Sequence, residues 1–331
     1  MNSAHSERLL APALQPGDTV GIVAPASNIK REALELGCAA LRRMGYKPFY
    51  LESILEQDLY FAGTAKRRLQ ELEQMFESRE VKAIICARGG YGANYLLQEL
   101  DVAKIARHPK IFMGYSDNTI LLTHIADSSG LVVFHGPMVA RDFADEDGVE
   151  TSSWEAAVSG QEQWQVPLNT EVIGLNDGSA QGVLYGGCLS ILAASLGTPY
   201  ELRTDDRILF LEDLGEKPYR IDRMLMQLKL AGKLDSVRGI IFGEMLDCFQ
   251  MQDQGYSLRE VVMRIVGDIG VPVAYGLRSG HVARQNITLP MGVKAELQVR
   301  GSEVSLKILE PATRSVAAAA SAKKGEQSFQ V

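Results

Sequence analysis

The sequence has few cysteines and no excess of basic residues. Its 331 residues contain four cysteines, Cys38, Cys86, Cys188 and Cys248, and none of them forms a C-x-x-C pair. We therefore expect no disulfide framework and no cysteine-rich metal site, and we interpret the thiols as small buried side chains in a reducing compartment. Lysine and arginine number 34 against 41 aspartate and glutamate, a net charge of −7. That balance leaves no positive surplus to bind nucleic acid or an anionic membrane.

Long hydrophobic segments are missing as well. The longest apolar stretches, such as residues 83–87 and 130–134, fall far short of the roughly 20 residues that a membrane span needs. The apolar patch at residues 9–14 is broken by Pro12 and is too short for the core of a signal peptide. We therefore expect a cytoplasmic protein without a nucleic-acid or membrane partner.

The overall composition is that of a globular protein. Hydrophobic residues make up 46% and charged residues 23% of the chain, close to the average of folded domains. At roughly 100–200 residues per domain, the length predicts about two domains.

Strand-like and helix-like segments alternate in the first half of the chain. The predicted strands cover residues 18–24, 47–51, 82–87, 110–115 and 131–135, and the predicted helices cover residues 32–44, 65–76, 93–100 and 118–126. Alternation in units of about 30 residues indicates βαβ crossovers and a parallel sheet. We expect an α/β domain similar to the flavodoxin or Rossmann fold over residues 1–160.

The second half has a mixed pattern. Strands are predicted at residues 182–184, 207–212, 237–243, 273–276, 286–289 and 293–309, and helices at residues 189–196, 220–230 and 258–269. The last two strands are expected to be antiparallel around a turn at residues 290–292. We expect a C-terminal mixed α/β domain over residues 175–312, followed by a mobile Ala/Ser/Lys-rich tail at 313–331.

The strongest local motif is MGYSDNT at residues 113–119, where a buried strand meets a helix. A serine on such a turn stands clear of the backbone, and the free N–H groups of the helix start can receive a developing oxyanion. Ser116 is therefore a candidate nucleophile. The pattern G-x-S-x-N departs from the G-x-S-x-G nucleophile elbow, so a plain N-cap role for Ser116 or Asp117 stays open.

A serine nucleophile needs a base and an acid that orients the base. Among the five histidines, His135 ends a predicted strand and His281 follows one. The apolar strand at residues 207–212 ends in two acids, Glu212 and Asp213. The residue chemistry alone leaves both choices open, because each histidine and each acid has an ordinary structural role available.

A glycine-rich loop, ARGGYG at residues 87–92, lies between another strand and helix. Its glycines permit positive φ and close backbone approach, so the loop can cradle a phosphate, receive an oxyanion or form a plain tight turn. As a dinucleotide fingerprint it lacks the third glycine, and no G-x-x-x-x-G-K-[ST] motif occurs.

Eight stretches of the chain, taken together, resemble one family, the LD-carboxypeptidases. They are PGDTVGIVAPAS (16–27), ICARGGYGANYLL (85–97), FMGYSDNT (112–119), FHGPM (134–138), YGGCLSIL (185–192), LFLEDLGEKPYRIDRML (209–225), GIIFGEM (239–245) and SGHVARQNITLPMG (279–292). The family comprises serine peptidases and includes cytoplasmic muramoyl-tetrapeptide carboxypeptidases and the related microcin immunity peptidases.

The resemblance implies a catalytic triad of Ser116, Glu212 and His281, with Glu212 chosen over Asp213 and His281 over His135. It also implies an oxyanion hole formed by the backbone N–H groups of Gly90 and Asp117, and it requires no metal or cofactor. In this family the nucleophile lies on the N-terminal domain and the acid and base on the C-terminal domain.

The substrate that the resemblance implies is a murein tetrapeptide, cleaved before its terminal D-alanine during peptidoglycan recycling. A homodimer is a further expectation. One alternative is an immunity-type peptidase that cleaves a peptidyl-nucleotide antibiotic. The other is a non-catalytic α/β protein that binds a small ligand at the glycine-rich loop.

Two positions depart from the family pattern. Cys188 stands where asparagine is usual, and Asn118 stands where an apolar residue is usual. We take Cys188, together with Arg88 and Tyr91, as candidate substrate-binding residues, with a surface salt bridge as the alternative role for Arg88.

Overall fold

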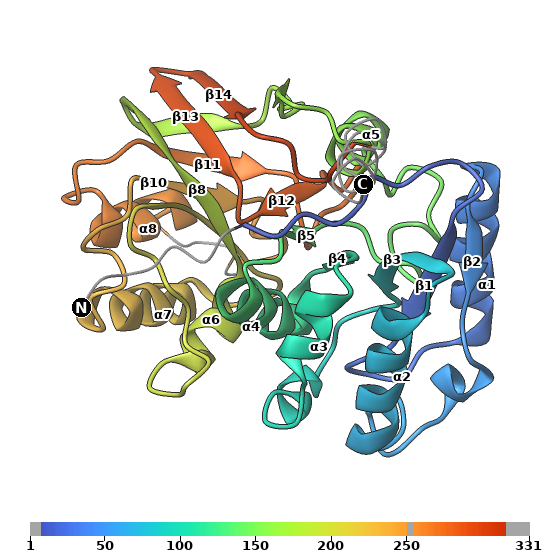
Figure 1. The fold of residues 1–331 in the computed structure, drawn as a ribbon. Coiled ribbons are helices and arrows are strands. Elements are labelled where there is room, and N and C mark those ends of the chain that lie inside the picture. Colours follow the sequence, from blue (N-terminus) through green and yellow to red (C-terminus); the bar gives the residue numbers. More distant parts are fainter. Residues whose placement is uncertain (1–7, 250–254, 316–331) are drawn as a thin grey trace, which may run out of the picture.

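The computed structural model describes residues 8–249 and 255–315, which form two β-sheets with helices packed around them (Figure 1). Most of the tail predicted at residues 313–331 lies outside the described residues. The described part of it is held in place, since Thr313 is buried and the Arg314 carbonyl accepts a hydrogen bond from the Ala13 N–H. Within the described ranges, no helix has both the length and the apolar character needed to cross a bilayer.

The first sheet has six strands in the order β12-β5-β4-β3-β1-β2. Its strands are β1 (Thr19–Val23), β2 (Lys47–Phe49), β3 (Val81–Cys86), β4 (Ile111–Gly114), β5 (Val133–His135) and β12 (Leu289–Met291). Its helices are α1 (Arg31–Arg43), α2 (Ala65–Glu77), α3 (Val102–Arg107), α4 (Thr119–Ser129) and α5 (Thr151–Val158), with short 3₁₀ turns η1 (Glu52–Leu55), η2 (Ala93–Leu96) and η3 (Ser116–Asn118). The strands β1 to β5 are parallel, which confirms the predicted α/β sheet, and β12 is antiparallel to β5.

The second sheet has eight strands in the order β6-β14-β13-β8-β9-β10-β11-β7. Its strands are β6 (Trp164–Gln165), β7 (Ile173–Asn176), β8 (Gly178–Cys188), β9 (Arg207–Glu212), β10 (Gly239–Gly243), β11 (Val273–Leu277), β13 (Lys294–Arg300) and β14 (Glu303–Ile308). The helices α6 (Leu189–Ser195), α7 (Pro218–Leu230) and α8 (Leu258–Val266) lie side by side along it (Figure 1). The strands from β8 to β11 are parallel and the others antiparallel, so the predicted mixed sheet is confirmed.

Local sequence explains where α2 begins and where α4 ends. The hydroxyl of Thr64 accepts a hydrogen bond from the Arg67 N–H and so caps α2, whose buried face carries Leu72 and Phe76. Gly130, with φ +74, ends α4 in the left-handed conformation that glycine adopts without strain.

Several predicted boundaries were wrong. The helix predicted over residues 93–100 is only the short 3₁₀ turn η2, in which the backbone N–H groups bond three residues back, as Leu97 does to the Asn94 carbonyl. The strand predicted over residues 293–309 is a hairpin, with Gly301 at φ +58 between β13 and β14. The strand predicted over residues 286–289 and the turn predicted after it are also misplaced, since β12 runs from Leu289 to Met291. Pro290 is tolerated there because β12 is an edge strand, where the missing N–H costs no ladder bond.

The strand β12 connects the two halves of the chain, because it lies between strands of the second sheet in sequence but pairs with β5 of the first. Leu289 is fully buried and lies opposite His135. Residues of both sheets share one continuous hydrophobic core, and α4 packs against both β5 and α6 (Figure 1). The domain boundaries expected at residues 160 and 175 stay a prediction.

We predict that Leu289→Ala lowers both stability and activity. Removing this buried side chain should cost about 2–5 kcal/mol of the free energy of unfolding. Because β12 follows the loop that carries His281, kcat should fall as well, even at temperatures where the variant is folded. The matched control is Leu234→Ala, equally buried but in the separate core of the second sheet. Chemical unfolding and steady-state kinetics should show a similar stability loss in both variants and a kcat loss in Leu289→Ala only; equal kcat losses would contradict the role of β12.

Candidate active site

Three polar side chains meet where parallel strands of the two sheets end. Ser116 follows β4, Glu212 is the last residue of β9, and His281 lies in the loop after β11. His281 Nε2 is 3.1 Å from Ser116 Oγ, and His281 Nδ1 is 2.8 Å from Glu212 Oε2. The backbone N–H of His281 also donates to Glu212 Oε2, at 3.0 Å. A hydroxyl, an imidazole and a carboxylate are thus joined in the order that nucleophilic catalysis requires.

The backbone of Ser116 is held in an unusual conformation. Its φ is +62°, in the left-handed region that non-glycine residues seldom adopt. This turn directs Oγ away from the strand axis and toward His281. A side chain at Gly89 would place its Cβ 2.5 Å from Ser116 Cβ, so only glycine permits the loop to pack this closely.

The glycine-rich loop is fastened to the turn around Ser116 by two side chains. Asp117 Oδ2 accepts a hydrogen bond from the Ala93 N–H at 2.7 Å, and Asn118 Nδ2 donates to the Arg88 carbonyl at 3.1 Å. Burial raises the pKa of Asp117 to about 6, against the opposing effect of the backbone amides that it accepts from. Within residues 8–249 and 255–315, the N–H groups of Gly90 and Asp117 themselves donate no hydrogen bond. Both amides are therefore available to a bound oxygen.

Glu212 is the electrostatic centre of the site. Its side chain is fully buried, and no lysine or arginine of the described residues pairs with it. Burial by itself raises the pKa of Glu212, but the charge of His281 and the hydrogen bond to His281 lower it, and the pKa lies below its usual range. For His281, burial lowers the pKa, and the charge and hydrogen bond of Glu212 raise it above its ordinary value.

A buried network joins the serine turn to the histidine loop. Asn286 forms two hydrogen bonds with the backbone of Gly280, each 3.0 Å long, and its Nδ2 also donates to Asp142 Oδ1 at 3.1 Å. The other oxygen of Asp142 accepts the Met138 N–H, and the Tyr115 hydroxyl lies 3.4 Å from Oδ1. Burial raises the pKa of Asp142 to about 6. Asp142 thus links the residues that precede Ser116 and His281.

A cavity of about 590 Å³ opens onto Ser116 and His281. Its lining includes the cations Lys30, Arg88 and Arg141 and the acids Asp117, Asp213 and Glu216. None of the three cations forms an ion pair within 4.0 Å among the described residues. The cavity therefore offers unpaired positive charge beside the serine.

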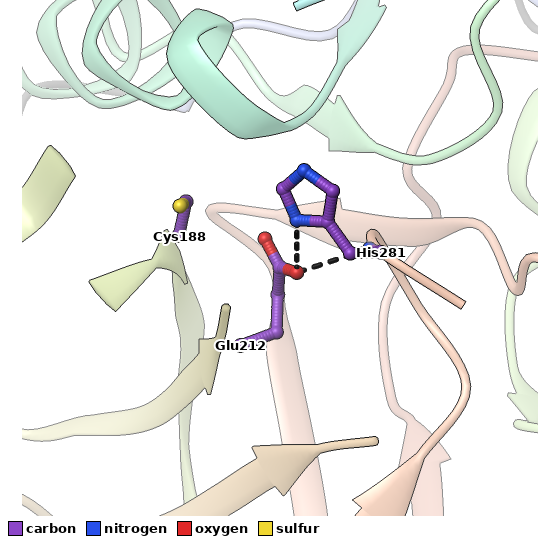
Figure 2. A group of neighbouring side chains, drawn as sticks. All are labelled: Cys188, Glu212 and His281. Carbon is purple, nitrogen blue, oxygen red and sulfur yellow. Dashed lines mark hydrogen bonds and ion pairs between the residues drawn. The ribbon is translucent and has the colours of Figure 1, made fainter. Parts of the chain in front are cut away.

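Cys188 lines the same cavity at the end of β8, where it pairs in register with Glu212. Figure 2 shows its thiol beside the hydrogen-bonded pair of Glu212 and His281, and ligand atoms of the three groups lie within 4.8 Å of one another. Burial, with the charges of Glu212 and Asp213, raises the pKa of the Cys188 thiol well above its usual value. The thiol is therefore neutral, and Glu212 Oε2 and His281 Nδ1 are already hydrogen-bonded to each other. This chemistry favours an acid–base pair over a metal site or a cysteine nucleophile.

The structure places the remaining candidates in different surroundings. His135 lies behind Glu212 and does not contact Ser116, and Asp213 accepts hydrogen bonds from the Ser190 and Leu214 amides. Tyr91 is not among the residues that line the cavity, and its ring packs near Phe61.

Sequence reasoning missed several residues of this site, among them Lys30, Arg141, Asp142 and Asn286. Asp142 and Arg141 follow the predicted strand at residues 131–135, in a segment for which we predicted neither a strand nor a helix. Asp142 and Asn286 are 144 positions apart, so neither has a local signal that identifies its partner.

Comparison with known proteins places these features in a family. Profiles of the LD-carboxypeptidase N-terminal and C-terminal domains match residues 20–136 and 181–297. The chain is 38% identical over 300 residues to the probable murein peptide carboxypeptidase of Bacillus subtilis, covering 90% of this chain and 94% of that protein. The structure of MccF in complex with glutamyl sulfamoyl guanosine matches with a TM-score of 0.85 at 25% identity, covering 92% of this chain and 100% of that one. The muramoyltetrapeptide carboxypeptidase from Oxalobacter formigenes matches with a TM-score of 0.77 at 30% identity, covering 88% and 98%.

We predict that Glu212→Gln lowers the pKa of His281. With the carboxylate charge removed, the largest influence that raises this pKa is gone while burial still lowers it, so the pKa should fall. NMR titration of the imidazole measures this change. Asp213→Asn is the matched control, since the smaller influence of Asp213 on His281 predicts a smaller downward shift. An unchanged His281 titration in Glu212→Gln would contradict the electrostatic account of the site.

Proposed function

Since the chain belongs to the LD-carboxypeptidase family and is a serine-type LD-carboxypeptidase, we propose that Ser116, His281 and Glu212 are its catalytic triad. We propose as its reaction the removal of the terminal D-alanine from L,D-linked murein tetrapeptides. The observation that carries the proposal is the unbroken chain of hydrogen bonds from Glu212 through His281 to Ser116.

The proposed reaction begins with a proton transfer. His281 Nε2 accepts the proton of Ser116 Oγ as the oxygen attacks the carbonyl carbon before D-alanine. Glu212 accepts the Nδ1–H, fixes this tautomer and balances the imidazolium charge. His281 then gives the proton to the departing amine, D-alanine leaves, and water releases the shortened peptide from the acyl-enzyme by the same steps.

The negative charge on the carbonyl oxygen is stabilised by the N–H groups of Gly90 and Asp117. Support comes from the place of Gly90 and Asp117 in the lining of the cavity that holds Ser116, and from the absence of any other acceptor for the two N–H groups among the described residues. Preorganised donors of this kind commonly contribute about 10² to 10³ in kcat.

The unpaired cations of the cavity support an anionic substrate. A carboxypeptidase must recognise the free carboxylate of the leaving residue, and Lys30, Arg88 and Arg141 offer positive charge next to the serine. A net charge of −7 for the whole chain is compatible with this, because the charge felt by the substrate is the local one. We place the activity in the cytoplasmic recycling of peptidoglycan peptides; the homodimer expected from the sequence stays a prediction.

We predict that Ser116→Ala lowers kcat for D-alanine release by a factor on the order of 10⁶, because triad members act as a unit. Release of D-alanine from a purified murein tetrapeptide is the measurement. The matched control is Ser128→Ala, which removes an exposed hydroxyl that lies 3.3 Å from His124 Nδ1 and outside the candidate site, and it should retain full activity. Near wild-type release by Ser116→Ala would exclude the assignment, and ligand binding by the wild type without any turnover would favour the non-catalytic alternative.

An immunity-type activity is the second candidate, supported by the close structural match to MccF bound to an aminoacyl sulfamoyl nucleoside. We predict that kcat/KM is higher for the murein tetrapeptide than for glutamyl sulfamoyl guanosine by at least about tenfold, a difference of about 1.4 kcal/mol in transition-state binding. Steady-state kinetics with both substrates on one enzyme preparation measures the ratio. The reverse order would make the immunity-type reaction the better assignment.

A further inference from the structure

A second imidazole lies against the buried carboxylate. His135 at the end of β5 is fully buried, and its Nε2 is 3.7 Å from Glu212 Oε1. Neither atom has a hydrogen-bond partner among the described residues. Buried polar atoms nearly always have one, so two that face each other at this distance require an explanation.

The neighbours of His135 determine where it carries its proton. Its Nδ1 lies 3.0 Å from Ser279 Oγ, and the Ser279 hydroxyl donates to the Ile287 carbonyl at 2.8 Å. A carbonyl can only accept, so the single hydroxyl proton of Ser279 is committed to Ile287. Ser279 Oγ must therefore accept from His135, and Nδ1 carries the proton of the neutral ring.

It follows that the Nε2 of a neutral His135 turns a lone pair toward Glu212. Two acceptors repel each other, which accounts for a separation longer than a hydrogen bond. When Nε2 takes up a proton from solvent, His135 becomes a cation. Its Nε2–H can then donate to Glu212 Oε1, and the repulsion becomes an ion pair. We propose that His135 is a positioning residue that takes up this proton, donates it to Glu212 Oε1, and so shares the carboxylate with His281.

The groups around His135 leave Glu212 as the acceptor for a proton on its Nε2. Among the described residues, the titratable groups that face His135 are Glu212 on β9 and Tyr115 after β4, with His281 across Glu212 and Asp142 behind Tyr115. The ring of Phe210 covers another side, and β12 contributes no titratable residue. Nearby, a Cβ added at Gly280 would lie 2.6 Å from Glu212 Cδ and 2.7 Å from His135 Cε1, so glycine is what lets this loop pack on the pair.

The shared carboxylate changes how the site responds to acid. Catalysis requires an unprotonated Nε2 on His281, which is lost as the pH falls. A proton on His135 offsets part of the Glu212 charge and repels a second proton on His281. His281 therefore stays a base to lower pH than it would with Glu212 alone. This inference rests on the proposed triad, but the protonation of His135 can be measured without any turnover.

The first experiment uses the wild-type enzyme and nitrogen-15 NMR of its imidazoles as a function of pH. The expected result is a His135 that carries its proton on Nδ1 at high pH and gains a second proton on Nε2 as the pH falls, while Nδ1 stays protonated. A neutral ring with the proton on Nε2, or an Nε2 that stays unprotonated down to the pH of acid unfolding, would overturn the proposal.

The second experiment compares the pH dependence of kcat/KM for D-alanine release. In His135→Gln a neutral amide replaces the ring, so no positive charge opposes the protonation of His281. The acid limb of the profile should therefore move to higher pH by about one unit. Ser279→Ala should move it in the same direction, because the freed ring can donate from Nε2 without taking up a charge. Ser195→Ala is the matched control, since it removes another buried hydroxyl that donates to the Leu192 carbonyl, and it should leave the profile unchanged.

The outcomes separate the proposal from a purely structural role. A His135→Gln profile that keeps the wild-type acid limb and only falls in height would show that His135 supports the fold and not the charge. If His135→Gln fails to fold, Ser279→Ala and the wild-type NMR titration still decide. A wild type that releases no D-alanine contradicts the proposed function but leaves the NMR test of His135 intact.

Discussion

A carboxylate buried without a lysine or arginine beside it is the constraint on which this structure depends. Glu212 is charged in an environment where an isolated charge is costly, and the imidazole of His281 is what balances it. The backbone around it is shaped to allow the approach: a Cβ added at Gly243 would lie 2.6 Å from Glu212 Cβ, and one at Gly280 would meet its carboxyl group. The buried charge of Glu212 therefore depends on His281, and the close approach of the two side chains depends on the glycines at positions 243 and 280.

The serine reaches this unit from the other sheet. Ser116 follows β4 in a left-handed turn, while Glu212 and His281 belong to the second sheet, so the hydrogen bond between Ser116 and His281 crosses from one sheet to the other. Two contacts hold the two halves of the chain together near the site. One is the pairing of β12 with β5, and the other is the buried hydrogen bond between Asp142 and Asn286. Rigid placement of this kind lets a hydroxyl and an imidazole meet in reactive geometry.

Part of this arrangement could be predicted from the sequence. Alternating strands and helices predicted the parallel sheet, and the strand-to-helix motif around Ser116 and the acid at the end of a buried strand predicted which kinds of residue meet at the candidate site. The choice of His281 over His135 and of Glu212 over Asp213 needed the family resemblance, because each pair has similar local surroundings. Lys30 and Arg141 could not be predicted, because their exposure to the cavity depends on packing between segments distant in sequence. The position of β12 was missed since its pattern contains Pro290, which only an edge strand tolerates.

The central claim is that Ser116 attacks the substrate and carries the acyl group. It is tested most directly by mixing the enzyme with a murein tetrapeptide, quenching the reaction in acid within the first turnover and mapping the digested protein by mass spectrometry. The account predicts that the peptide containing Ser116 gains the mass of the substrate minus D-alanine, and that this adduct forms no more slowly than D-alanine is released. An adduct on Cys188, or D-alanine release at the full rate with no adduct on Ser116 in any quenched sample, would contradict it.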